Sequence, residues 1–232
     1  MVSRGVDVDG AGALLASAPE EFDKILTALE FGGDADLNIT LPEAREKTLI
    51  RIRAVRDVWD PMKAAAARIA DGSATAEDVN FVLTQNMAVL DAAVELVPEL
   101  VKQYANPNAV SHATLLQIDI SGRQRMLTQK MSKEACIMGT EFRTETTASD
   151  LEGTMGLFDA SLNALRFGMP ELSLPPPPTD EISAGLEVVL SDWTSVMPML
   201  ESVAGGQGAD ATEAATTLQQ LNATLANMNA DV

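Results

Sequence analysis

The stretch FDASLNALRFG, residues 158–168, decides how this chain is organised, because a second version of it, FDKILTALEFG, occupies residues 22–32. Seven of the eleven positions are identical, at a constant offset of 136 residues. Convergent helical composition accounts for shared Ala and Leu, but it does not account for the Phe-Asp pair that opens both stretches. The two stretches therefore predict an internal duplication.

Landmarks outside the two stretches extend this repeat. Pro42 lies opposite Pro178 at the same offset, and the two tryptophans, Trp59 and Trp193, follow at an offset of 134 residues. Both tryptophans fall in apolar helical registers, so we expect them to be buried. The repeat predicts two homologous bundles.

We expect the first bundle over residues 1–106 and the second over residues 107–232, divided at the Asn-Pro-Asn stretch that begins at residue 106. The second bundle has a long predicted helix, about residues 112–142, ahead of its Phe-Asp helix. Its counterpart in the first bundle would lie before Met1. Either the chain starts inside a longer protein, or one first helix serves both bundles.

The fold class follows from the spacing of apolar residues. Aromatic residues make up only 4% of the chain, strict alternation is absent, and apolar residues recur at intervals of three and four. These stripes predict an all-α fold of tandem antiparallel helical bundles of the four-helix type. They run from Phe22 to Leu29, Ile52 to Ile69, Val79 to Val97, Leu116 to Met138, Phe158 to Leu165, Ile182 to Leu200 and Leu218 to Met228.

Charge excludes two classes of partner. The chain has 16 Lys and Arg residues against 34 Asp and Glu residues, which gives a net charge of −18. Such a surface repels phosphate backbones and anionic lipid, so we expect no nucleic-acid binding and no peripheral membrane role. No uninterrupted apolar stretch approaches roughly 18 residues, so we also expect neither a membrane span nor a secretory signal.

The counts of cysteine and histidine restrict the chemistry. The chain has one cysteine, Cys136, and one histidine, His112, which are too few for an internal disulfide and leave a His/Cys metal site or a His-based catalytic dyad nearly excluded. Carboxylates at the Glu-x-x-His spacing of di-iron bundles are also absent. We therefore expect no enzyme, no catalytic residues, no metal and no cofactor.

The helix predicted at residues 112–142 carries the stretch IDISGRQRMLTQKM, residues 118–131. Its apolar face predicts packing inside the bundle and consists of Leu116, Ile120, Leu127 and Met131. A second stripe advances by alternating fours and threes, the heptad spacing of a helix that faces another helix. That stripe consists of Ile118, Gly122, Arg125, Gln129, Ser132 and Cys136.

The second stripe predicts a homodimer through residues 114–138. A glycine inside a helix costs about 1 kcal/mol relative to alanine, so we expect another backbone to approach closely at Gly122. The same region is basic in an acidic chain, with Arg123, Arg125, Lys130 and Lys133 close together. An arginine fork binds small anions in a planar, bidentate manner, so the cluster predicts an anion site.

At these residues the sequence resembles the PilJ-type sensor domain of type IV pilus chemoreceptors and, more distantly, the sensor domain of NarX-like nitrate kinases. The family signature reads Ile-Asn-x-Ala-Gly-Arg-Gln-Arg-Met-Leu, and this chain departs from it at Asp119, in place of Asn, and at Ser121, in place of Ala. The resemblance implies a four-helix periplasmic sensor bundle that dimerises through its first helix and binds nitrate or nitrite on the dimer axis. It also implies that Arg125 is the residue that contacts the anion.

Two hypotheses remain open at this point. In the first, the chain is a non-enzymatic sensor that binds a small anion at the residues around Arg125. In the second, the bundle is structural or binds a partner, because Asp119 neutralises the arginines or because they pair with Glu134 and Glu141. The candidate ligand-binding residues are Asp119, Ser121, Gly122, Arg123, Arg125 and Gln129.

Overall fold

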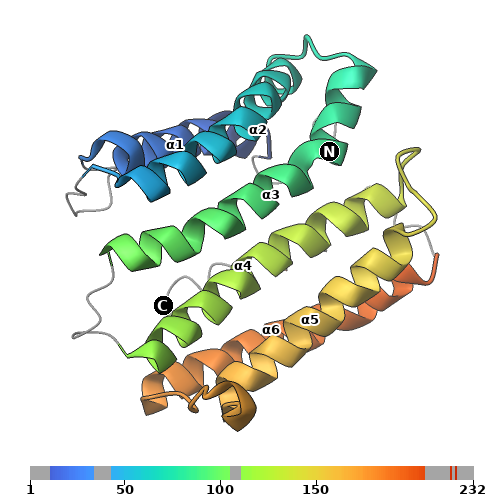
Figure 1. Ribbon diagram of the computed structural model, residues 1–232. Coiled ribbons are helices and arrows are strands. Elements are labelled where there is room, and N and C mark those ends of the chain that lie inside the picture. Colours follow the sequence, from blue (N-terminus) through green and yellow to red (C-terminus); the bar gives the residue numbers. More distant parts are fainter. Residues whose placement is uncertain (1–10, 34–42, 105–110, 207–219, 221–222, 224–232) are drawn as a thin grey trace. The chain divides into compact units, whose positions relative to one another are not determined.

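The computed structural model describes residues 11–33, 43–104, 111–206, 220 and 223 (Figure 1). Within these residues the elements are helices, joined by turns, with an isolated β-bridge between Met169 and Leu174. The predicted all-α fold is confirmed. The elements are α1 (Ala11–Phe31), α2 (Glu46–Ala70), α3 (Ala76–Tyr104), α4 (His112–Met138), α5 (Thr147–Phe167), the 3₁₀ turn η2 (Pro170–Leu172) and α6 (Asp180–Ala204).

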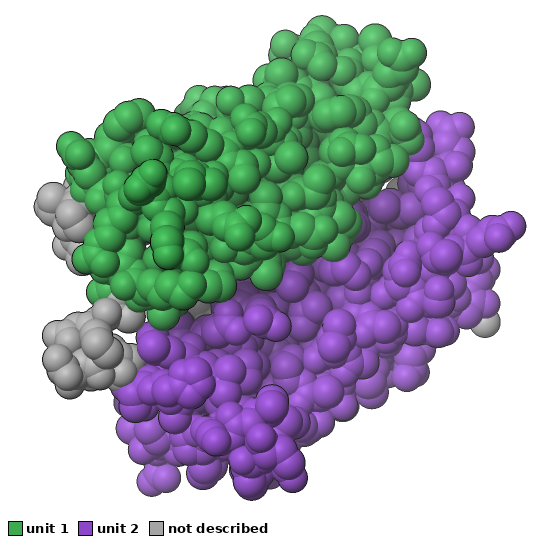
Figure 2. All heavy atoms as spheres, in the orientation of Figure 1, with its two compact units in different colours: residues 1–109 green, residues 110–232 purple. Residues whose placement is uncertain are grey.

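The chain forms two compact units, residues 1–109 and residues 110–232 (Figure 2). The boundary predicted between residues 106 and 107 lies outside the described residues, and so does nearly all of the helix predicted from Leu218 to Met228. The interpretation of the two units as copies of one bundle stays a prediction.

The unit of residues 1–109 contains α1, α2 and α3. Its core is aliphatic around one tryptophan and consists of Leu26, Ile52, Val55, Trp59, Val89 and Leu96. The apolar spacing of three and four residues places all of these side chains on the inward faces of their helices. The predicted burial of Trp59 is confirmed, since 7% of it is exposed.

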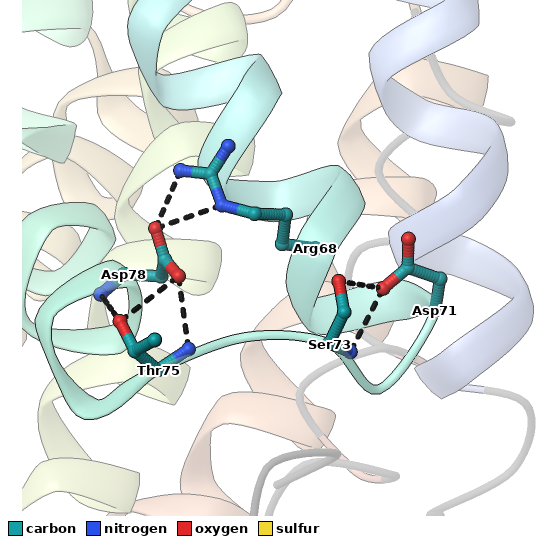
Figure 3. Close-up of polar contacts among 5 residues, drawn as sticks. All are labelled: Arg68, Asp71, Ser73, Thr75 and Asp78. Atoms are coloured by element: carbon teal, nitrogen blue, oxygen red, sulfur yellow. Dashed lines mark hydrogen bonds and ion pairs between the residues drawn. The ribbon is translucent and has the colours of Figure 1, made fainter.

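A short polar turn joins α2 to α3 (Figure 3). Thr75 caps α3, because its Oγ1 accepts from the backbone N–H of Asp78 while the Asp78 carboxylate accepts from the N–H of Thr75, at 3.3 and 2.9 Å. Arg68 donates to the same carboxylate. The hydrogen bonds from Arg68 and Thr75 hold the pKa of Asp78 far below its usual range. The turn therefore fixes where α2 ends and α3 begins.

Helix α3 bears on the expectation that the chain has no membrane span, which stays a prediction. By length and composition it is apolar enough to cross a membrane, and 11% of its most apolar window is buried. No uninterrupted apolar run of this length is present, because α3 reaches its apolar average through Val, Leu and Met residues spaced among polar ones. In this unit, Val89 and Leu96 of α3 belong to the core.

The unit of residues 110–232 contains α4, α5 and α6, which run in alternating directions (Figure 1). Its core is larger than that of the first unit and centres on Phe158 and Trp193, whose rings lie 4.6 Å apart. Leu127 and Met131 of α4, Leu162 of α5 and several α6 residues surround them. The predicted burial of Trp193 is confirmed, with 2% of it exposed.

Corresponding residues of the two units make the same contacts. The indole N–H of Trp59 donates to Asp23 at 2.7 Å, and that of Trp193 donates to Asp159 at 3.2 Å. Phe22 packs on Trp59 at a centroid distance of 4.7 Å, much as Phe158 packs on its tryptophan. In each unit the Phe-Asp helix is thereby tied to the tryptophan helix that follows it.

Candidate functional site

Helix α4 carries the stretch that the sequence singled out. It begins after Ser111, whose hydroxyl accepts from the backbone N–H of Thr114 at 3.0 Å, and its C-terminal cap is Gly139. A serine cap of this kind satisfies one of the donors left open at a helix start. Residues 118–131 therefore lie well inside a continuous helix, so their helical spacing decides which face each occupies.

The apolar face of α4 packs as predicted. Leu127 and Met131 are buried in the core of the 110–232 unit, and Leu116 and Ile120 are half-buried nearer the start of the helix. This face holds α4 against α5 and α6. Gln124 and Thr128, which lie between these positions, are buried as well, whereas Gly122, Arg123, Arg125 and Gln129 are exposed.

The predicted second stripe of α4 divides into two parts. Gly122, Arg125 and Gln129 are exposed, and Ile118 is 52% exposed although it is apolar. Ser132, farther along the same stripe, is buried, and Cys136 is half-buried. Only the first half of the stripe is therefore open to a partner or a ligand.

Gly122 has free space around it. A Cβ atom built on Gly122 meets no atom within 4 Å. No described part of the chain makes the close backbone approach expected at this position. The close approach expected in a homodimer stays a prediction.

The charged residues of the open face differ in their partners. Arg123 forms an ion pair with Asp119 at 3.0 Å, one helical turn away, and 62% of the arginine side chain is exposed. Exposed pairs of this kind contribute at most about 1 kcal/mol to stability. No described residue forms a salt bridge with Arg125. Asp119 therefore neutralises Arg123 and leaves the Arg125 guanidinium exposed to solvent.

Lys130, which the sequence placed in the basic cluster, lies in a buried polar group. Its ammonium donates to Glu134 Oε1 and to Thr154 Oγ1, each at 2.6 Å, and Glu134 is only 5% exposed. A buried carboxylate needs such a counter-charge, because an unpaired one is costly to desolvate. Lys130 therefore stabilises the α4–α5 contact and is not available to a ligand.

Gln124, like Thr128, is a buried polar residue of the stretch that was not predicted from the sequence. It is fully buried, and its amide donates to the backbone carbonyl of Phe158 at 3.0 Å and to Ser161 Oγ at 2.8 Å. Its spacing from Leu127 and Met131, three and seven residues, would have placed it on the apolar face. A glutamine in such a register signals a specific polar contact, since buried amides need partners.

Two further reactive groups of α4, Cys136 and Lys133, are partly buried, whereas His112 at its start is exposed. Burial raises the pKa of the Cys136 thiol, which keeps it protonated and poorly nucleophilic. Burial also lowers the pKa of Lys133 below its usual range. Within residues 11–33, 43–104 and 111–206, no three His, Cys, Asp or Glu side chains lie together in a way that could hold a metal ion.

Comparison with known proteins adds one match. The family model described as "Type IV pili methyl-accepting chemotaxis transducer N-term", PilJ, matches residues 109–229, slightly more than half of the chain. The matched range begins just before α4 and covers all the candidate site residues. Neither the curated proteins nor the solved structures gave a match.

Proposed function

The chain belongs to the PilJ family, the N-terminal region of type IV pili methyl-accepting chemotaxis transducers, and from this premise we propose that its 110–232 unit is an extracytoplasmic sensor for a small anion. The family match supports a sensor region of a chemotaxis transducer. The anion, of the nitrate or nitrite type, binds at Arg125 on the exposed face of α4. The unit acts without catalysis, in the periplasm.

The proposal rests on the exposure of Arg125, which has no salt-bridge partner among the described residues. Its neighbours in the basic cluster are engaged, Arg123 by Asp119 and Lys130 by Glu134. Arg125 is exposed one helical turn from Gly122, and a Cβ atom built on Gly122 meets no atom within 4 Å. A guanidinium offers two parallel N–H donors that match the planar oxygens of a small oxyanion.

A homodimer through residues 114–138 completes this site. Two facing copies of α4 bring two Arg125 side chains together, and like charges at short range repel each other. A bridging anion removes that repulsion and accepts charge-assisted hydrogen bonds from both sides. Occupancy then changes how the two α4 helices pack, and this change in packing is the signal.

The second candidate function is a structural or partner-binding bundle. The ion pair between Asp119 and Arg123 favours it, because that pair neutralises half of the arginine charge on the face without any ligand. In that case the exposed Ile118 and Gly122 form a contact for another protein chain, and no anion is required.

Titration calorimetry with sodium nitrate and sodium nitrite, and chloride as the reference salt, separates the two functions. The sensor predicts saturable binding to the wild type, loss of that binding in Arg125→Ala and tighter binding in Asp119→Asn. The matched control is Arg53→Ala, another exposed arginine, which lies on α2. Absence of binding to the wild type, together with marked destabilisation of Asp119→Asn, supports the structural bundle instead.

A further inference from the structure

Helix α3 carries a second apolar stripe, on a different face from the residues that it contributes to the core. The stripe advances by alternating fours and threes, the spacing of a helix that pairs with another helix. It consists of Leu83, Met87, Leu90, Val94, Val97, Val101 and Tyr104. The buried residues Val89 and Leu96 lie about 120° around the helix from its centre. The helix continues through Pro98 to Tyr104, so the stripe is unbroken.

Much of this stripe is open in the part of the chain that the structure describes. Val94, Val97 and Val101 are 50%, 43% and 37% exposed, and the other four members are half-buried. Helix α3 has two buried residues in a length of 29, whereas α6, with 25 residues, has six. By composition, however, α3 is apolar enough to cross a membrane. The open stripe accounts for this combination of an apolar helix and little buried surface.

The residue types along the stripe indicate which partner fits it. In the heptad notation abcdefg, the a positions are Met87, Val94 and Val101, and the d positions are Leu83, Leu90, Val97 and Tyr104. Branched residues at a, combined with leucine at d, favour a parallel pair of helices. Asn80 occupies the preceding a position, and a single asparagine at a fixes the register of such a pair. The stripe therefore fits an identical stripe on a second copy.

The charges beside the stripe also suit a second copy, although the chain has a net charge of −18. In a coiled coil the e and g positions flank the contact. Between Leu83 and Tyr104 they are Thr84, Asn86, Asp91, Ala93, Pro98 and Leu100. Asp91 is the one charged residue among them. Glu95 and Glu99, on other faces of α3, form ion pairs with Arg51 and Lys102 of the same chain. Two copies of the stripe therefore meet with little repulsion.

We propose that the stripe of α3 is an interface between two copies of this chain, which pair in parallel as a two-stranded coiled coil over residues 80–104. The contact is about 36 Å long. A two-fold axis relates the two helices, so the interface closes on itself and produces a dimer. It lies in the first unit and depends neither on the anion sensor nor on the pairing of α4 proposed with it.

Sedimentation equilibrium of the whole chain tests this pairing. The background variant is Ile118→Glu, because a carboxylate on the open face of α4 opposes pairing through residues 114–138. We expect a dimer in this background. Adding Val94→Glu should weaken the dimer at least about a hundredfold, since two carboxylates would face each other in the desolvated contact.

The matched control is Val188→Glu on α6, a valine that is 49% exposed, and it should dimerise like the background. A chain that remains monomeric in the Ile118→Glu background overturns the proposal. Equal dimerisation with and without Val94→Glu overturns it as well, because the dimer then forms elsewhere or another segment of the chain covers the stripe.

Cysteine cross-linking tests the direction of the helices without adding charge. Val94→Cys and Val101→Cys are made separately in a Cys136→Ser background and oxidised with glutathione disulfide, with Val188→Cys as the control. In a parallel pair each position faces its own copy, so both variants should form disulfide-linked dimers and the control should not. In an antiparallel pair at most one of two positions seven residues apart can do so. Cross-linking of one alone overturns the parallel arrangement, and cross-linking of neither overturns the interface.

Discussion

The two units share an internal contact and differ in the charges around it. In both, the aspartate of the Phe-Asp pair accepts from the indole of the tryptophan on the following α-helix, Asp23 from Trp59 and Asp159 from Trp193. In each unit an ion pair also joins the Phe-Asp helix to the tryptophan helix, but the acidic and basic residues are exchanged between the two helices. In the first unit Glu30 accepts from Arg56, and in the second Arg166 donates to Glu187.

This difference shows which interactions determine the bundle. The Phe, Asp and Trp positions bury large areas and satisfy a polar N–H, so their identities are constrained. The ion pairs are partly exposed and contribute at most about 1 kcal/mol each, so either polarity serves. This pattern supports the prediction that the units are copies of one bundle.

The second difference is α4, which has no counterpart among the described helices of the first unit. It brings Gln124, Thr128 and Glu134 into the interior and presents Arg125 outside. Polar groups in a core restrict which packing is acceptable, and here they occur in the same helix as the candidate site. The four predictions below test how far the two units are equivalent.

The largest effect is expected from shortening the phenylalanine of each Phe-Asp pair. Phe158 is fully buried, so Phe158→Ala should destabilise its unit by about 3–5 kcal/mol. Phe22 is only half-buried, so Phe22→Ala should cost clearly less. Urea unfolding followed by tryptophan fluorescence, in backgrounds with Trp59→Phe or Trp193→Phe, reports each unit separately. Equal costs would contradict the difference in burial.

The next effect concerns two lysine–carboxylate pairs, Lys130 with Glu134 within α4 and Lys63 with Asp23 between α2 and α1. Lys130→Met leaves Glu134 buried without its counter-charge and should cost roughly 3 kcal/mol. Lys63→Met breaks a more exposed pair with Asp23 and should cost at most about 1 kcal/mol. The double variant Lys130→Met with Glu134→Leu should recover most of the loss. If Lys130→Met proves as mild as Lys63→Met, the buried polar group is not structural.

A smaller effect is expected from acid. Burial acts to raise the pKa of Asp23, but hydrogen bonds from Lys63 and Trp59 outweigh it and hold that pKa below its usual range. As the pH falls, Asp23 is therefore protonated in the unfolded chain before it is protonated in the folded unit. The first unit loses stability from about pH 4 downward, until Asp23 is protonated in the folded unit as well. Asp23→Asn should lessen this loss in unfolding measured between pH 5 and 2. Asp57→Asn, an exposed aspartate of α2, controls for the change in net charge.

The periodicity of the sequence was sufficient to predict the helices, the apolar face of α4 and the burial of both tryptophans, because burial of one helix face follows from spacing. It was not sufficient to tell the cations of the basic cluster apart. Lys130 and Arg125 look alike in a basic cluster, and only the position of Glu134 and Thr154 on the folded helices distinguishes them. The turn after α5 depends on Gly168 and on the path of the proline run, residues 175–178, which have no periodic signature.

The smallest effect is expected at Gly122, and it bears most directly on whether α4 meets a second copy. In a monomer, Gly122→Ala and the control Gly153→Ala on α5 should each stabilise the second unit by about 0.5–1 kcal/mol, since both glycines are helical and a Cβ meets nothing at either. In a homodimer with closely packed backbones, the added methyl at Gly122 lies in the contact. Its stabilising effect should then disappear as the protein concentration rises, while that of Gly153→Ala persists. Unfolding measured over a hundredfold range of concentration, with light scattering on the same samples, tests this. Equal gains for both variants at every concentration would exclude a close approach at Gly122.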